Sequence, residues 1–188
     1  MRPIIFQISR QMKTCVTQVF WRLVFVSAIL TFSSLVHADD VFLRNWKVAA
    51  KNGNVNAQYS IASYYMARGI YREGIEWYTK AAENGHARAQ YELADMLMEG
   101  DRVPKSFDRA VYWYRKSAEN GFEKAQAKLG IMYVHGGMVG KDPVQAYRWL
   151  RLAVLHGNLE AADELNELVD RMTPEQIDAA EKLVAKDK

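Results

Sequence analysis

Residues 81–85, Ala-Ala-Glu-Asn-Gly, decide the fold, because this five-residue pattern returns at regular intervals along the chain. It appears as Ala-Ala-Lys-Asn-Gly at 49–53, as Ser-Ala-Glu-Asn-Gly at 117–121 and, more loosely, as Ala-Val-Leu-His-Gly at 153–157. The four glycines are 32, 36 and 36 residues apart. A period of this length is typical of helical solenoid repeats.

Other positions follow the same period. An alanine stands four residues after each glycine and an isoleucine or leucine eight residues after it, at Ala57, Ala89, Ala125 and Ala161 and at Ile61, Leu93, Leu129 and Leu165. A glutamine follows the first three alanines, at Gln58, Gln90 and Gln126, and a tryptophan precedes the last three glycines by eight residues, at Trp77, Trp113 and Trp149. Because this spacing places apolar side chains on one helical face, we expect two helices per unit and interpret the tryptophans as core residues.

Turn and capping residues separate the two helices of each unit. Gly100 and the pair Gly136-Gly137 interrupt the chain, and Ser106 and Asp142 are suited to cap the helix that follows. Pro143 fits a first helical turn. Small residues at three equivalent positions predict a close approach of the paired helices, at Ala62, Ala94 and Gly130. One helix pair cannot bury this much apolar surface alone, so the pairs are expected to stack.

The pattern resembles the Sel1-like repeat, a relative of the tetratricopeptide repeat. The fullest copy is Ala-Gln-Ala-Lys-Leu-Gly-Ile-Met-Tyr at 125–133, followed by Gly-Gly-Met-Val-Gly-Lys-Asp at 136–142. The resemblance covers about residues 45–170, and the first unit lacks four residues in its internal loop at 66–71. It implies an all-α fold, a right-handed α-solenoid of stacked helix-turn-helix repeats.

The repeat glycines and the composition of the N-terminal residues divide the chain into predicted segments. They are a signal peptide at 1–38, an N-terminal capping helix at 39–53, three repeats at 54–85, 86–121 and 122–157, and a partial fourth repeat with capping helices at 158–188. In the last segment, Thr-Pro-Glu-Gln at 173–176 predicts a capping box that opens a final helix ending near Lys186.

Residues 1–38 have the composition of a secretory signal. They contain four basic residues and no acidic one, an uncharged run at 23–36, and small residues at Val36 and Ala38. We therefore predict cleavage between Ala38 and Asp39 and a periplasmic or secreted protein. Since a membrane span needs about 20 apolar residues, the alternative of an anchor at 16–36 is disfavoured. The sequence leaves open whether translation starts at Met1 or Met12.

Composition excludes several partners. Without residues 1–38 the chain keeps 21 of its 25 basic residues against 22 acidic ones, a net charge of −1. We expect no nucleic-acid partner, since those need a clustered positive surface, and no membrane partner after cleavage. The single cysteine, Cys15, lies in the signal, so the mature protein would have no disulfide.

No common catalytic motif is present, including HExxH, the P-loop, GxGxxG and GxSxG. His86, His135 and His156 are dispersed rather than placed at metal-ligand spacing, so we expect no metal and no cofactor. The family resemblance leaves one alternative, an enzyme or ligand-binding protein that acts on cell-wall or β-lactam compounds, because some cysteine-rich secreted Sel1 proteins are described as binding or hydrolysing β-lactams. The lack of cysteine in these repeats weakens that alternative, and the sequence favours a protein that is not an enzyme.

The resemblance places a partner-binding groove on the concave face, formed by the first helix of each unit. The corresponding positions lie 3, 6, 10 and 13 residues after each glycine. They are Asn56, Tyr59, Ser63 and Met66 in the first unit and Arg88, Tyr91, Asp95 and Met98 in the second. The third unit has Lys124, Ala127, Ile131 and Val134, and the fourth has Glu160, Asp163, Glu167 and Asp170.

The first two units carry the predicted site. Their groove positions are outside the repeat-defining core, so we infer that packing does not explain which side chains stand there. Tyrosine and arginine are favoured at binding hot spots, and methionine adapts to varied ligands. We therefore expect an adaptor or scaffold that binds a protein or peptide. The alternative is an ordinary solvated helix face.

Overall fold

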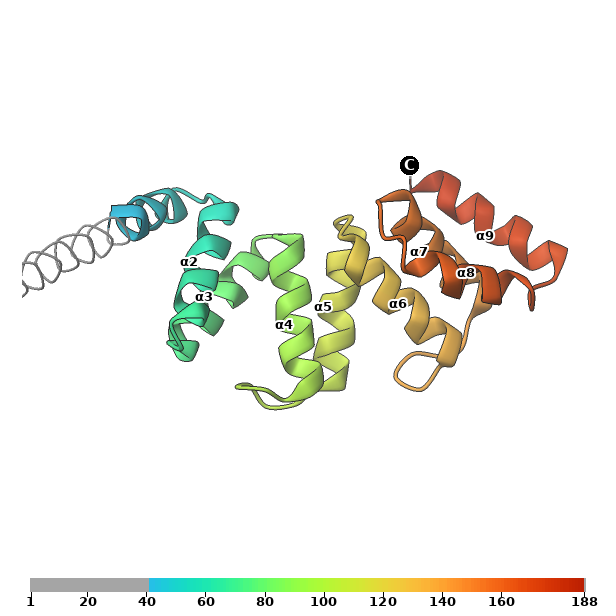
Figure 1. The fold of residues 1–188 in the computed structure, drawn as a ribbon, viewed down its shortest axis with the longest axis horizontal. Coiled ribbons are helices and arrows are strands. Elements are labelled where there is room, and N and C mark those ends of the chain that lie inside the picture. Colours follow the sequence, from blue (N-terminus) through green and yellow to red (C-terminus); the bar gives the residue numbers. More distant parts are fainter. Residues whose placement is uncertain (1–40, 188) are drawn as a thin grey trace, which may run out of the picture. The chain divides into compact units, whose positions relative to one another are not determined.

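The computed structural model describes residues 41–187, which are helical apart from turns and loops (Figure 1). The predicted signal peptide, its cleavage site and the alternative anchor lie outside these residues. The chain divides into two compact units, 1–45 and 46–188, and the repeats belong to the second. Residues 41–51 are helical and precede α2 (Val55–Ala67), α3 (Tyr71–Glu83), α4 (Ala87–Glu99), α5 (Phe107–Glu119), α6 (Glu123–His135), α7 (Pro143–Leu155), α8 (Ala161–Val169) and α9 (Pro174–Lys186).

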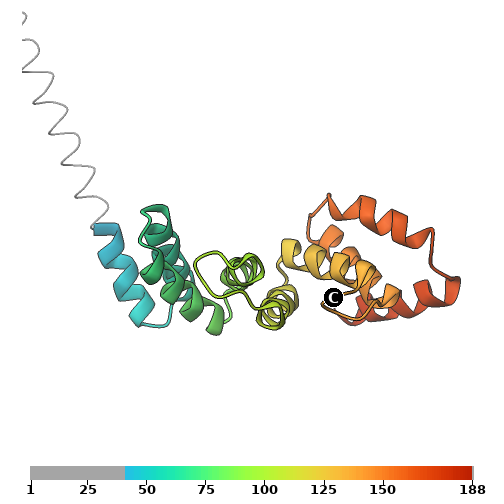
Figure 2. The same cartoon turned by 90° about the horizontal axis from the view of Figure 1, so that it is seen from below.

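Each helix of the second unit packs mainly on its sequence neighbours. From α2 to α7 every helix contacts the next one, and α7 contacts both α8 and α9. Figure 1 and Figure 2 show the helices succeeding one another in this order. Contacts restricted to neighbours define a solenoid. The prediction of an all-α solenoid is therefore confirmed.

The predicted caps form, with one exception. Gly100 ends α4 in the left-handed conformation at φ 76°. Asp142 Oδ1 accepts hydrogen bonds from the backbone N–H groups of Val144 and Gln145, both at 3.0 Å, with Pro143 in the first turn. The capping box at 173–176 is complete. Ser106 precedes α5, but its side chain makes no capping hydrogen bond, which corrects its predicted role.

A buried glutamine joins each repeat to the one before it. Gln90 Nε2 donates to the carbonyl of Ala82 at 2.9 Å, and its Oε1 accepts from Asn120 Nδ2 at 2.9 Å. We call this arrangement the glutamine clamp. It recurs as Ala50–Gln58–Asn84 and as Ala118–Gln126–His156. Each clamp satisfies a buried amide and links a repeat to the helix before it, which is the N-terminal helix in the case of Gln58 and the preceding repeat in the other two.

The tryptophans occupy less of the core than predicted. Trp149 is 5% exposed, but Trp77 and Trp113 are only partly buried. The next residue in each of those helices, Tyr78 or Tyr114, is buried instead. One helical step of about 100° turns the tyrosine toward the paired helix and leaves the tryptophan at the edge. Trp149 differs because α7 packs on α9 as well.

The close approach predicted at Gly130 is present. A Cβ added there would lie 2.7 Å from Leu150 Cγ and 3.1 Å from the Leu150 backbone nitrogen. Ala62 and Ala94, at the equivalent positions, are fully buried. Gly74 makes a further close approach, to Met66, which the sequence comparison missed because no other repeat has a glycine there.

Replacing Gly130 with alanine should therefore destabilise the protein. Overpacking costs about 1–3 kcal/mol, and better helix propensity returns at most about 1 kcal/mol. Because backbone as well as side chain opposes the new methyl group, we expect a net loss of about 1–2 kcal/mol, measured by urea denaturation. Gly140→Ala is the matched control, since a Cβ there meets no atom within 4 Å. Equal stability of the two variants would contradict the close approach.

Candidate functional site

Two tyrosines predicted to line the groove connect successive repeats. The ring of Tyr59 on α2 stacks on His86 with centroids 4.5 Å apart and planes 6° from parallel. Tyr91 on α4 makes edge contacts with Tyr114 at 5.7 Å and Phe122 at 5.2 Å. His86 and Phe122 are equivalent, each following a repeat glycine. The position six residues after the glycine therefore packs on the next repeat, which corrects the interpretation that packing does not explain it.

The polar groove positions are engaged within their own repeats. The Ser63 hydroxyl lies 3.2 Å from the hydroxyl of Tyr78, and the Tyr114 hydroxyl donates to Asp95 Oδ1. Burial, reinforced by Asp95, raises the pKa of Tyr114 and raises that of Tyr91 to about 12. Both phenols therefore stay protonated at neutral pH. Ser63 and Asp95 therefore bond to the second helix of the first and second repeats respectively, a contact that the sequence analysis missed.

The methionines at the last groove position face the paired helix. Met66 lies against Gly74 of α3, where a Cβ would approach its sulfur to 2.7 Å. Met98 is partly buried against the core, and Val134 at the same position of the third repeat is buried. Thirteen residues after the glycine, all three side chains pack against the core, and the two methionines keep part of their surface exposed. Met66 and Met98 thus take part in packing, and their role in a groove wall stays a prediction.

Asn56 and Arg88 remain exposed at the first groove position. The Arg88 side chain is 58% exposed, lies 5.6 Å above the Tyr59 ring and pairs with Glu92, with 3.5 Å between Nε and Oε1. Burial lowers the pKa of His86, which favours the neutral form of the ring that stacks on Tyr59. We call Asn56, Tyr59, His86, Arg88 and Glu92 the α2/α4 strip. His86 and Glu92 were missed, although the spacing of Arg88 and Glu92 is a helical ion-pair signal.

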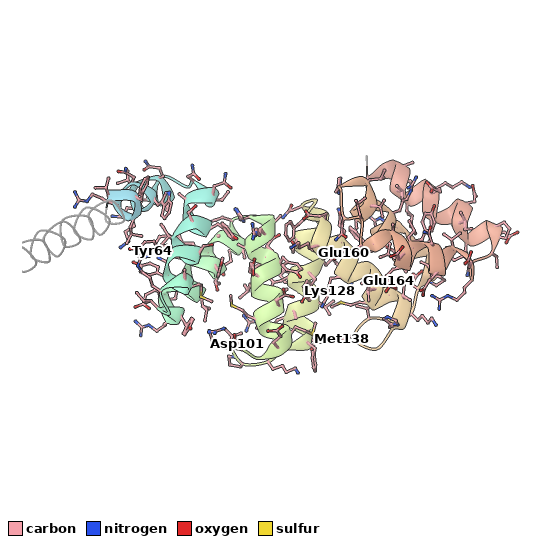
Figure 3. The ribbon with its side chains drawn as sticks, in the orientation of Figure 1. Tyr64, Asp101, Lys128, Met138, Glu160 and Glu164 are labelled. Carbon is pink, nitrogen blue, oxygen red and sulfur yellow. The ribbon has the colours of Figure 1, made fainter. Side chains whose placement is uncertain are left out.

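The later repeats present a different surface at the same positions. Lys124 is exposed, but Ala127 is buried, and Ile131 is partly buried against the core. On α8 and at its two ends the four positions are acidic and exposed, at Glu160, Asp163, Glu167 and Asp170. Figure 3 labels Glu160 and Glu164 of this acidic face and Lys128 on α6. The third repeat thus keeps an exposed cation, Lys124, but has alanine where the first two repeats have the aromatic residues Tyr59 and Tyr91.

A model of the Sel1 repeat family matches residues 55–86, 87–122 and 123–158. The chain belongs to the Sel1 repeat family. The matched residues contain α2 to α7 and with them the strip. A search among curated proteins gave no match.

Solved structures of Sel1 proteins are similar over most of the chain. A Sel1 repeat protein from Oxalobacter formigenes is 35% identical over 66% of this chain and 97% of its own, with a TM-score of 0.63. The protective antigen c5321 of uropathogenic Escherichia coli, which has an SLR fold, is 30% identical over 77% of this chain, with a TM-score of 0.66. Our chain spans only 32% of that antigen. Cysteine-rich protein B of Helicobacter pylori is 20% identical over 65% of this chain and 96% of its own, with a TM-score of 0.51, and shows the fold alone.

Between residues 41 and 187, no helix is long and apolar enough to cross a membrane. Within the same range, no group of three or more His, Cys, Asp or Glu side chains is arranged to hold a metal ion. The chemistry that the α2/α4 strip offers is hydrogen bonding, charge and aromatic contact.

Proposed function

We propose that this Sel1 repeat protein is an exported adaptor that binds a protein or peptide partner through the α2/α4 strip. Sel1 repeats form scaffolds whose stacked helices present one continuous surface. The composition of residues 1–38 supports export. The observation that carries the proposal is Arg88, which stays exposed above the ring of Tyr59 while His86 stacks on that same ring.

The strip combines an anchored platform with an accessible cation. Tyr59 and His86 are held by their mutual stacking, and His86 Nδ1 also accepts from the backbone N–H of Ala89 at 3.1 Å. A platform that is already ordered loses little side-chain entropy when a partner binds. Arg88 and Glu92 form an exposed ion pair, and such pairs contribute little to the free energy of folding. Replacing Glu92 by a partner's carboxylate as the group paired with Arg88 therefore costs little. An extended or helical segment with acidic and aromatic side chains fits this surface.

Binding should depend on the exposed members of the strip. Once the partner is identified by capture on the purified protein, Asn56→Ala with Arg88→Ala should weaken its binding by about 2 kcal/mol or more, roughly 30-fold in Kd. Titration calorimetry measures this loss. Tyr91→Ala is unsuitable as a probe, because Tyr91 contacts Tyr114 and Phe122 and its removal also lowers stability.

The matched control is Lys124→Ala with Glu160→Ala. These residues are exposed and occupy the same repeat position in the third and fourth units. Normal binding by this control and weakened binding by the first double variant support the proposal; the reverse result places the partner on the later repeats. The β-lactam alternative stays a prediction, and turnover of nitrocefin by the purified protein would test it.

A further inference from the structure

A pocket of about 420 Å³ lies beside the turn that joins the second and third repeats. Asn120 and Gln126 line it from the side of that turn, and Arg148, Trp149 and His156 line it from α7 and its end. Asp187, just after α9, also lines it. The pocket shares no residue with the α2/α4 strip.

Arg148 is held in a geometry that suits a carboxylate. Its Nε donates to Asp187 Oδ2 at 2.5 Å and its second terminal nitrogen to Asp187 Oδ1 at 2.8 Å, which is a bidentate pair. The guanidinium lies 4.5 Å from the Trp149 ring centroid, and its other terminal nitrogen donates to Gln145 at 3.3 Å. These two contacts orient the guanidinium independently of Asp187.

The repeats do not require these residues for folding. Glu76 and Tyr112 occupy the position of Arg148 in the first and second repeats, and Asn84 and Asn120 occupy that of His156. Asparagine completes the glutamine clamp in those repeats, so histidine is not needed for it. The third repeat thus combines two functional groups that its neighbours lack at these positions.

The clamp also fixes the state of His156. Gln126 Nε2 donates to the Ala118 carbonyl at 3.0 Å, so Gln126 Oε1 must be the acceptor in its 2.8 Å contact with His156 Nδ1. Nδ1 therefore carries a proton. In the neutral ring, Nε2 keeps its lone pair and can accept a hydrogen bond from a ligand N–H group.

We propose that this pocket binds the carboxylate of an acidic peptide and that Asp187 occupies the site as a tethered competitor. The ligand carboxylate would replace Asp187 on Arg148, and a neighbouring peptide N–H would donate to His156. The Glu119 carboxylate at the same pocket lies 3.4 Å from Lys116 Nζ, which offsets its repulsion of an acidic ligand. This inference is independent of the proposed function of the strip.

The test uses three blocked peptides as probes: N-acetyl-Gly-Asp-Gly-amide, N-acetyl-Gly-Gly-Gly with a free terminal carboxylate, and neutral N-acetyl-Gly-Asn-Gly-amide. The Arg148 Nε–Hε resonance of the isotope-labelled protein reports binding by NMR. Because the tethered carboxylate acts at millimolar or higher effective concentration, Asp187→Asn should tighten binding of an acidic probe by about tenfold. The tighter of the two acidic probes shows whether a side-chain or a terminal carboxylate is preferred.

Arg148→Met should abolish the probe-induced shifts of His156 in the Asp187→Asn background. Arg151→Met is the matched control, because Arg151 lies on the same helix and pairs with Glu181 rather than Asp187. Thermal melts verify that each variant is folded. The inference is overturned if no acidic probe binds the Asp187→Asn variant, if the neutral probe binds equally well, or if binding survives the loss of Arg148.

Discussion

Replacing Tyr114 with alanine is expected to lower the free energy of unfolding by about 3–5 kcal/mol, the usual cost of truncating a large buried aromatic residue. Tyr114 is 0% exposed and is among the largest fully buried side chains of the described part. Its ring contacts Tyr91, and its hydroxyl donates to Asp95. The substitution would therefore leave a cavity between α4 and α5 and a carboxylate without its donor. Urea denaturation followed by circular dichroism measures the loss.

Two further variants separate the contributions at this position. Tyr114→Phe keeps the ring and removes only the hydrogen bond to Asp95, so we expect a loss of about 1–2 kcal/mol. Trp113→Ala removes a larger but only partly buried side chain and should cost less than Tyr114→Ala. If Trp113→Ala proved the more damaging of the two alanine variants, the assignment of the core to the tyrosine would be wrong.

Replacing Gln90 with leucine is expected to cost about 1–2 kcal/mol, because two hydrogen bonds are lost. The Ala82 carbonyl keeps its bond from the Gly85 backbone N–H, and Asn120 Nδ2 keeps a longer contact with the Gly85 carbonyl. Leucine has a similar volume, so the loss reports the hydrogen bonds rather than a cavity. Since the clamp links neighbouring repeats, unfolding should also become less cooperative, with a lower slope against urea concentration.

Gln145→Leu provides the control for this prediction. Gln145 lies on α7, is only partly buried and does not take part in a glutamine clamp. A change within about 0.5 kcal/mol is expected there, as for most surface substitutions. If Gln90→Leu caused an equally small change and left cooperativity intact, the clamp would not couple the repeats.

The helices and their stacking could be predicted from sequence because their determinants are local and periodic. Glycine after a helix and a proline-containing capping box each act within a few residues, and the small residue at the helix–helix approach recurs at the same place in all three full repeats. Gly85 and Gly121, for example, follow α3 and α5 with φ of 88° and 82°. Repetition of such signals at 32 or 36 residues made the solenoid evident.

The candidate site was less predictable, because it depends on how one repeat meets the next. Tyr59 and Tyr91 lie on the expected helices, yet their rings pack on His86 and Phe122 of the following units. A residue's exposure at such a junction is set by partners about 30 residues away, and the sequence pattern does not specify their orientation. Arg88 was correctly predicted to be exposed, because its position on the helix faces solvent and does not lie at the junction with the following repeat.

The glutamine clamp also makes it possible for a Sel1 protein to gain or lose a whole repeat. Removing residues 86–121 would join Gly85 directly to Phe122 and bring Ala82 into the place of Ala118 beside Gln126. Every clamp would still find a carbonyl and a donor, and Tyr59 would meet Phe122 in place of His86. Gene duplication or deletion of a whole unit therefore preserves the junction chemistry. Each copy is then free to diverge at its exposed positions, as the third repeat has done with Arg148 and His156.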